Sequence, residues 1–487
     1  MRTSRTVAAE DTAVPPVREL TAGQQSLWLQ HTLAPQGAAY NDGGAALITP
    51  PPPAGPLRQA VRATAQRHEL LRSVFAESNG RPVRVVRDAA VVPLEVRDSA
   101  DATEAELGAQ VRQIMTDPYR LTRQPPFRVV LLRRARDAVL VMTAHHIATD
   151  ATSQRLIWRD LLAAYEATAT GAEPAWPALT ATFDDYVTRE RDTLGSPRGA
   201  ELERYWREAC ADGTAAELPT DLPRPPQRAF SGGTVLRRLP GELEPRLRAA
   251  ASRLGVTPFA FLLGSFFCLL YRCTGQPDLM IGCPASTRRT RAMRDVVGLF
   301  VNPIALRARF TPRTTLAQAV TEASSQLRGG MARLDYPFTY LAARPDREPW
   351  FRITFTMVSS DRVTAGGDRA PLSLSGWPPD LVPADEPVSR AGHLMTFLET
   401  PRLEGQFDLS VEMTRTANAM TAVFRYDTDL FLPSTVEGLA GRFERMVAAA
   451  CADPDTLVDR VPLLSDDERR RVLAMSGQAS QGSGGQP

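Results

Sequence analysis

The sequence predicts a mixed fold of helices and strands arranged in two lobes, and three observations carry this prediction. The chain has 487 residues, too many for one ordinary hydrophobic core. Helical and strand-like spacings of apolar residues alternate in both halves. Residues 168–177, rich in Thr, Ala, Gly and Pro, interrupt this periodicity. We therefore expect a first lobe at residues 17–177 and a second at 178–470, between a disordered leader at 1–16 and a disordered tail at 471–487.

The first half of the chain predicts helices and strands in alternation. Thr21 stands where a helix N-cap is expected, Gln24 follows three residues later, and apolar residues continue at helical spacing to Leu33. The same spacing predicts further helices at 57–67, 103–115 and 152–167. Runs of apolar and β-branched residues predict strands at 44–48, 70–75, 83–86, 127–133 and 138–144.

The second half again mixes the two patterns. Helices are expected at 198–210, 242–254, 257–272, 315–330 and 434–451. Strands are expected at 279–282, 304–307, 351–358, 407–413 and 421–426. Residues 361–391 are dense in Gly, Pro, Asp and Ser, and a loop of that length is usually functional or mobile.

Composition and charge exclude several classes of protein. The 57 basic and 55 acidic residues give a net charge of +2, and no basic block is long enough to predict binding to nucleic acid or an anionic membrane. The longest apolar run, 259–271, is well short of the roughly 20 residues that a membrane-spanning helix needs. The N-terminus has no apolar signal region, so we expect a cytoplasmic protein.

Cysteine and lysine usage narrows the chemistry further. The five cysteines form no C-x-x-C pair, which predicts reduced, mostly buried thiols and no zinc site built on them. All 57 basic residues are arginine, so the chain has neither a P-loop lysine nor a lysine that could form a Schiff base. A bond-forming enzyme with this composition is expected to receive its activated group ready-made, without using ATP itself.

Two of the five histidines stand side by side at the end of a predicted strand. The stretch 138–151 runs through that strand to His145 and His146 and reaches Asp150 before the next predicted helix. A neutral imidazole accepts a proton near neutral pH, and a carboxylate four residues away can orient it or anchor the loop. Strand alternation directs the two rings to opposite sides, so one can be structural while the other faces a cleft. His146 is therefore the candidate base.

Three other interpretations of this stretch stay open on the residues alone. The histidines could be satisfied core residues. They could form a metal site with Asp150, although a catalytic zinc needs three protein ligands and no third is evident. They could belong to a Ser-His-Asp hydrolase, although the chain contains no G-x-S-x-G elbow.

The stretch His145-His-Ile-Ala-Thr-Asp-Ala151 resembles the H-H-x-x-x-D-G signature of nonribosomal peptide synthetase condensation domains. That family belongs with the chloramphenicol acetyltransferase-like acyltransferases. Other segments resemble further motifs of the family in the expected order, namely Leu20–Trp28, Arg67–Phe75, Ile281–Arg288, Val297–Arg307, Tyr336–Phe338 and Tyr426–Phe431. The resemblance extends from about residue 18 to residue 470.

The resemblance implies a fold and a reaction. It implies two chloramphenicol acetyltransferase-like lobes in a V-shaped pseudo-dimer, with the active site at the lobe junction. An acyl or peptidyl carrier protein would deliver an acyl or aminoacyl thioester on its phosphopantetheine arm, and a small-molecule or carrier-bound nucleophile would attack it. The product would be an amide or an ester, and the chain itself would bind no cofactor and no metal. The absence of lysine agrees with energy that arrives as a thioester.

Four residues acquire roles from the resemblance. It implies that His146 deprotonates or positions the attacking amine or hydroxyl, or stabilises the tetrahedral intermediate. His145 would support it. Asp150 would do no proton chemistry and would instead form a salt bridge with Arg288, which ties the motif loop to the second lobe. An alternative for Arg288 is a solvated surface charge.

Other positions bear on the expected cleft or tunnel. Asn302 and Thr356 match positions that line it, and Ala151 is expected beside them. Ala151 stands where the family has glycine, and Ser26 stands where the first motif usually has arginine. Glycine permits close approach of the pantetheine arm, so the methyl group of Ala151 either narrows the tunnel or is accommodated. The histidine and aspartate of the motif are unaffected.

Two functions therefore remain as hypotheses. We expect a free-standing condensation enzyme, because the family motifs begin near the N-terminus and end near residues 463–468. A domain cut from a larger synthetase is the alternative arrangement. The alternative function is a degenerate, non-catalytic module that docks carrier proteins or tailoring enzymes, and Ala151 motivates it.

Overall fold

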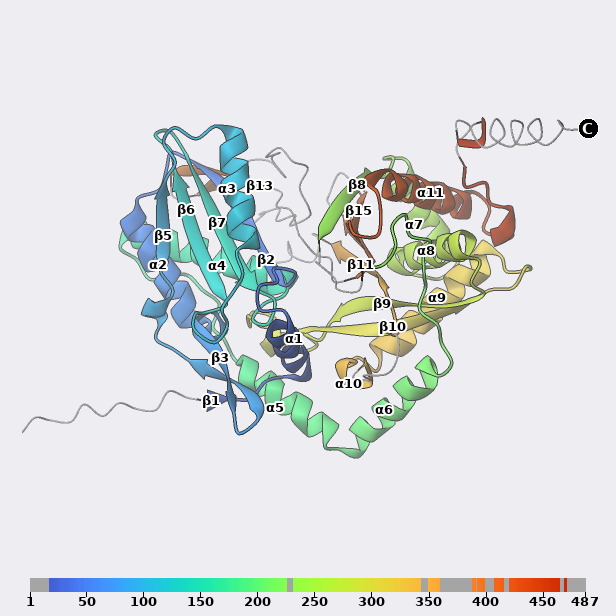
Figure 1. Ribbon diagram of the computed structural model, residues 1–487, viewed down its shortest axis with the longest axis horizontal. Helices are drawn as coiled ribbons and strands as arrows, with labels where there is room; N and C mark the ends of the chain where they lie inside the picture. The colour runs from blue at the N-terminus through green and yellow to red at the C-terminus, as the bar shows by residue number, and fades with distance from the viewer. Residues whose placement is uncertain are drawn as a thin grey trace, which may run out of the picture.

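The protein is described from a computed structural model in which two lobes, each built on a β-sheet, lie side by side (Figure 1). The structure describes residues 17–225, 231–342, 349–359, 388–390, 392–398, 407–415, 420–464 and 468–470. The expected disordered leader and tail lie outside these residues, as does most of the predicted loop at 361–391. The mixed α/β class and the two lobes predicted from the sequence are confirmed.

The first lobe is a six-stranded sheet with helices packed on it. The sheet has the strand order β12-β13-β2-β7-β6-β5. Its strands are β2 (Asn41–Thr49), β5 (Leu94–Asp98), β6 (Phe127–Arg133), β7 (Ala138–His145), β12 (Val388–Arg390) and β13 (His393–Leu398). The helices of this part of the chain are α1 (Ala22–Leu33), α2 (Ala54–Arg67), α3 (Glu104–Thr116) and α4 (Ala151–Thr170). A small sheet joins β1 (Val17–Arg18), β4 (Arg81–Val86) and β3 (Ser73–Ser78).

The helix start predicted at Thr21 is confirmed, the helix predicted at 57–67 begins earlier, at Ala54, and one predicted strand is wrong in its first half. Thr21 caps α1 in a capping box with Gln24, as its position in the sequence indicates. The strand predicted at 70–75 begins only at Ser73, because Glu69–Arg72 form a turn of 3₁₀ helix in which the Leu71 N–H donates to the His68 carbonyl (3.0 Å). Periodicity cannot separate a short turn with a buried apolar pair, such as Leu70 and Leu71, from a strand.

The second lobe is also a six-stranded sheet, with the order β10-β9-β11-β14-β15-β8. Its strands are β8 (Gly232–Arg238), β9 (Asp278–Ser286), β10 (Val301–Arg309), β11 (Ile353–Ser359), β14 (Leu409–Arg415) and β15 (Met420–Asp427). Its helices are α7 (Leu243–Arg253), α8 (Pro258–Thr274), α9 (Leu316–Met331), α10 (Thr339–Ala342) and α11 (Pro433–Ala452). Helices α5 (Phe183–Leu194) and α6 (Pro197–Cys210) run along the base from one lobe to the other (Figure 1). The sequence predicted α6 at 198–210 and missed α5.

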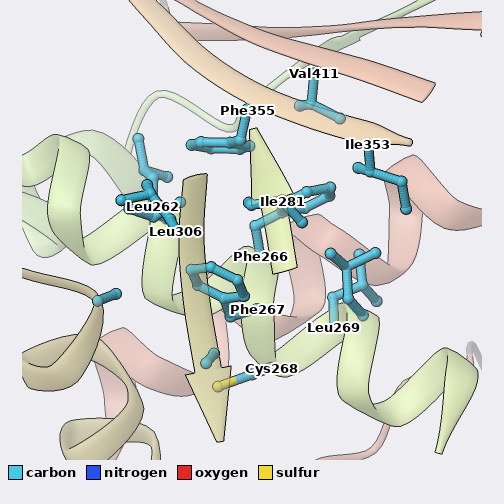
Figure 2. Packing of buried hydrophobic residues seen from close by; sticks show 14 of the residues in the cluster. Leu262, Phe266, Phe267, Cys268, Leu269, Ile281, Leu306, Ile353, Phe355 and Val411 are labelled. Carbon is cyan, nitrogen blue, oxygen red and sulfur yellow. The ribbon is translucent and has the colours of Figure 1, made fainter. Parts of the chain in front are cut away.

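The largest hydrophobic core lies between the second sheet and helix α8. Figure 2 shows Phe266 and Phe267 of α8 packed against Ile281 of β9 and Phe355 of β11. The rings of Phe266 and Phe355 are stacked with centroids 4.9 Å apart. Burial of each such side chain contributes about 1.5–3 kcal/mol. The apolar run at 259–271 is therefore a core helix, as its composition predicts.

No single helix in the described part of the chain is long and apolar enough to cross a membrane, although α7 and α8 would reach that length together if their 97° bend were ignored.

Four strands of each sheet repeat one arrangement. In the first lobe β2 is antiparallel to β7, β7 is antiparallel to β6, and β6 is parallel to β5. In the second lobe β8 is antiparallel to β15, β15 is antiparallel to β14, and β14 is parallel to β11. The strands β7 and β15 each lead into a helix of 20 residues, α4 and α11. The two lobes are thus related as the halves of a pseudo-dimer.

The second half of the chain also contributes a segment to the first lobe, which departs from the expected division at residue 177. Strands β12 and β13 follow the second lobe's β11 in sequence but extend the first lobe's sheet, where Phe397 pairs with Ala46 of β2. The rings of Phe397 and Trp158 of α4 pack edge to face, with centroids 5.3 Å apart. Pairing between strands more than 300 positions apart leaves no trace in local periodicity, so the sequence could not predict it.

Candidate functional site

The two histidines lie in the short connection between β7 and α4, residues 145–150, which we call the histidine loop. His145 is the last residue of β7, and Asp150 is the N-cap of α4. The backbone N–H of His146 donates to the Tyr40 carbonyl (2.7 Å), and Gln24 Nε2 of α1 donates to the Ile147 carbonyl (2.8 Å). The loop is therefore fixed from the first lobe at two points.

His146 is half-buried, and its hydrogen bond shows which ring nitrogen carries the proton. Nδ1 lies 2.5 Å from the backbone carbonyl oxygen of Thr149. A carbonyl oxygen only accepts, so Nδ1 carries the proton and donates. In the neutral ring Nε2 then holds a lone pair, which is the atom that can accept a proton from a nucleophile.

His145 is buried and uncharged. Burial lowers its pKa to about 3, and the neighbouring His31 and His146 act in the same direction. Its Nδ1 accepts the Ile147 N–H (3.1 Å), so the proton of the neutral ring is on Nε2. The rings of His31 and Tyr119 meet it edge-on, with centroids 6.0 and 6.1 Å away. His145 thus supports the loop without placing a positive charge beside His146.

Asp150 ties the loop to the second lobe through the ion pair that the resemblance implied. It is buried, and its Oδ2 accepts a hydrogen bond from Arg288 Nη1. The backbone N–H groups of Ser153 and Phe300 donate to its two oxygens (2.7 and 3.0 Å). Burial by itself would raise the pKa of this carboxyl, but Arg288 and the Ser153 hydrogen bonds outweigh it and hold the pKa below its ordinary value. Asp150 is therefore ionised, and both of its carboxylate oxygens accept hydrogen bonds.

Arg288 follows β9 and makes one further bond across the lobe junction and two contacts within its own lobe. Its Nη2 donates to Ser153 Oγ (2.7 Å) and to the Val296 carbonyl (3.1 Å). The guanidinium lies over the Phe300 ring, 4.1 Å from its centroid. Ser153 Oγ also bonds both backbone groups of Gly298, accepting from N–H (3.0 Å) and donating to the carbonyl (2.8 Å). The first turn of α4 is thus joined to the segment between β9 and β10.

The remaining predicted site residues occupy three different positions. Ala151 is half-buried in the first turn of α4, directly after Asp150. Thr356 is half-buried on β11, where its hydroxyl donates to the Pro284 carbonyl (3.3 Å). Asn302 lies on the wall of a small cavity with Glu190, but its polar atoms are engaged elsewhere. Its Nδ2 donates to the Leu334 and Tyr336 carbonyls (2.8 and 2.6 Å), and its Oδ1 accepts the Phe338 N–H (3.0 Å).

Sequence reasoning missed several residues that hold this site. Gln24 was identified only as part of a helix cap, and Ser153 and Tyr40 were not singled out. Their spacing from the histidines carries no chemical signal, because the contacts form only when α1 and the second lobe are folded against the loop. Among the described residues no group of three or more His, Cys, Asp or Glu side chains could hold a metal ion.

Comparison with curated proteins finds relatives along almost the whole chain. Phosphinothricin tripeptide synthetase PhsC of Streptomyces viridochromogenes is 32% identical over 465 residues, which cover 93% of this chain and 41% of that protein. Phosphinothricin tripeptide synthetase PhsB of the same organism is 31% identical over 479 residues, which cover 96% of this chain and 38% of that protein. The chain thus spans less than half the length of these relatives.

Solved structures share the fold. The X-domain from teicoplanin biosynthesis matches with a TM-score of 0.80 and 24% identity, over 94% of this chain and all of that one. The first condensation domain of the CDA synthetase matches with a TM-score of 0.73 and 23% identity, over 92% of this chain and 99% of that one. The family model described as the condensation domain matches residues 16–473. With its histidine loop, its two lobes and this match, the chain belongs to the condensation-domain family of nonribosomal peptide synthetases.

Proposed function

We propose that the chain transfers an acyl or aminoacyl group from the thioester of a carrier protein's phosphopantetheine arm to an amine or an alcohol. Condensation domains act on carrier-bound thioesters, and the energy of the thioester removes any need for ATP in this step. The nucleophile forms a C–N or C–O bond with the thioester carbonyl as the C–S bond breaks. The products are an amide or ester and the free carrier thiol.

The observation that carries this proposal is the unprotonated Nε2 of His146. Because Nδ1 donates to the Thr149 carbonyl, Nε2 is the nitrogen able to take the nucleophile's proton during attack. The resulting imidazolium can return that proton to the departing thiolate, so the ring ends the cycle neutral. The buried, neutral His145 adds no charge that would oppose protonation of His146.

Asp150 and Arg288 contribute position rather than proton transfer. Both carboxylate oxygens already accept hydrogen bonds, and the low pKa of Asp150 keeps it ionised through the catalytic cycle. Their ion pair holds the histidine loop against the second lobe, from which the other wall of a substrate path would come.

The test is product formation with a loaded carrier and a panel of amines and alcohols. We expect His146→Ala to lower the rate at least about 100-fold, since a positioned base contributes 10²–10⁴-fold. His146→Gln is the matched control for the hydrogen bond, because it offers an N–H donor but no base, and it should be equally inactive while it unfolds at the wild-type temperature. Equal product from wild type and His146→Ala would refute the catalytic role.

The second candidate function is a non-catalytic module that docks carrier proteins or tailoring enzymes. Ala151, at the position of the family glycine, favours it, and one similar structure is a complex of the teicoplanin X-domain with OxyB. It predicts saturable binding of a carrier with no turnover over the whole acceptor panel. Turnover that depends on His146 excludes it.

A further inference from the structure

The two wholly buried glutamines of the described chain both hydrogen-bond to the histidine loop. Gln24 of α1 and Gln154 of α4 each have 0% of their surface exposed, and the other described glutamines are at least partly exposed. Burial of an amide costs roughly 1–3 kcal/mol unless its polar atoms are hydrogen-bonded. Gln24 donates to the Ile147 carbonyl. Gln154 holds the loop at its other end.

Gln154 reaches the loop through the side chain of Thr149. Its Nε2 donates to Thr149 Oγ1 (3.1 Å), and Thr149 is itself fully buried. The carbonyl of the same Thr149 is the group that accepts from His146 Nδ1 (2.5 Å). Three residues thus form a continuous chain of contacts, from the amide of Gln154 through Thr149 to the ring of His146.

The first turn of α4 divides its contacts between two partners. Asp150 and Ser153 bond to the second lobe through Arg288 and Gly298. Gln154, the next residue, turns back to the histidine loop instead. Its Oε1 is buried and accepts no hydrogen bond within the part of the chain that the structure describes. Within the described residues, the hydrogen bond to Thr149 is therefore the one that the buried side chain of Gln154 makes.

We propose that Gln154 is a positioning residue that sets the tautomer of His146. By holding Thr149 in place, it keeps the Thr149 carbonyl aligned with Nδ1, so that the proton stays on Nδ1 and Nε2 stays free. Its effect on the rate rests on the condensation activity proposed above, whereas its effect on the tautomer does not. Gln154 lies outside the histidine-aspartate motif and touches His146 only through Thr149.

The tautomer can be read directly from nitrogen NMR shifts of the full-length chain labelled with ¹⁵N-histidine. The chain has five histidines, and His146→Ala assigns the relevant signals. In the wild type we expect His146 protonated on Nδ1 and His145 on Nε2, from their hydrogen bonds. Gln154→Met, which matches the length of the side chain without its amide, should move His146 toward the Nε2–H form and leave His145 unchanged.

Two threonines provide a matched pair for this experiment. Thr149→Val removes the hydroxyl that Gln154 binds and should reproduce the shift seen in Gln154→Met. Thr152→Val removes a hydroxyl three residues away that accepts a long bond from Arg155 (3.3 Å), and it should leave both histidines as in the wild type. An unchanged His146 tautomer in Gln154→Met or in Thr149→Val would overturn the proposal.

Kinetics separate positioning from a merely structural role. We expect Gln154→Met and Thr149→Val each to lower kcat by about five-fold at unchanged KM, the effect of one lost hydrogen bond. Because both act through one contact, the double variant should be no slower than either single variant, and losses that multiply would contradict the proposal. If the wild type shows no turnover while the tautomer shifts as expected, the condensation function fails and the positioning role stands.

Discussion

The strand ends of β7 and β15 occupy equivalent places in the two lobes, yet only one carries the histidine pair. Each strand pairs with its neighbours in the same order and direction, and each leads through a short loop into a 20-residue helix. In the first lobe that loop contains His145, His146 and Asp150. In the second lobe it runs from Asp427 to Leu432. The same strand-loop-helix arrangement therefore occurs in both lobes, but only the first lobe has histidines in the loop.

The start of the following helix distinguishes the two places. Helix α4 is capped by its own Asp150, which is buried and paired with Arg288 of the other lobe. Helix α11 begins after Leu432, whose N–H donates to Asp221 Oδ2 (2.8 Å), and Asp221 also accepts from the Thr435 hydroxyl (2.8 Å). Asp221 is exposed and belongs to the same lobe. The start of α11 thus has no side-chain cap of its own and is held at the surface by Asp221, whereas the cap of α4 is buried and bonds to the other lobe.

The largest expected difference between the two helix starts is in the free energy of unfolding. Asp150→Ala leaves Arg288 buried without its partner, which costs about 3–5 kcal/mol. Asp221→Ala removes two exposed hydrogen bonds near the start of α11 and should cost only about 1 kcal/mol. Denaturant unfolding of the two variants measures both values, and the substitution is the same in each. Equal losses would mean that the Asp150–Arg288 ion pair contributes no more than the exposed hydrogen bonds of Asp221.

The sequence predicted some residues of the site and not others. His146, Asp150 and the strand and helix around them were identified because they are neighbours in sequence and their residue types indicate chemistry. Arg288 was reached only through the resemblance. Gln24, Gln154 and strand β13 were not assigned their places, because their partners lie far along the chain or carry no distinctive residue type. Local periodicity encodes burial, and it does not encode which buried surfaces meet.

A second prediction concerns pH and the support of the histidine loop. Glu190 Oε1 accepts the N–H of Ala22 at the start of α1 (2.7 Å), the helix from which Gln24 holds the loop. Burial raises the pKa of Glu190 to about 7, although the Ala22 N–H opposes this. Tyr186 and Tyr340 are the titratable groups that interact with it from α5 and α10.

The folded protein keeps the Glu190 proton to a higher pH than the unfolded chain does, so its stability falls as the pH rises. Below the ordinary pKa of a glutamate the folded and unfolded chains are both protonated at this group, and its contribution to stability is complete. As pH rises through about 7, Glu190 must ionise in a half-buried position, and that contribution is lost. Glu190→Gln keeps an acceptor for Ala22, so we expect it to be more stable than wild type by about 1–3 kcal/mol at pH 8 and similar at pH 4.

Unfolding at a series of pH values measures this difference. Glu437→Gln, on the exposed surface of α11, is the control in the other lobe, and it should leave the pH dependence as in the wild type. If the free energy of unfolding of Glu190→Gln follows that of the wild type at every pH, ionisation of Glu190 does not destabilise the fold. The attachment of α1 would then be independent of pH.

The smallest expected effect is at the first residue of each helix, Ala151 in α4 and Pro433 in α11. Ala151 has an ordinary helical conformation, so its backbone does not require the glycine found in the family. Ala151→Gly should therefore cost less than about 1 kcal/mol of stability and leave the rate with a loaded carrier within about two-fold of wild type. Pro433→Ala, at the equivalent place without histidines, should cost a similar amount and leave the rate unchanged. If Ala151→Gly instead gains turnover that the wild type lacks, the methyl group closes the site, and the wild-type chain has the docking function rather than the catalytic one.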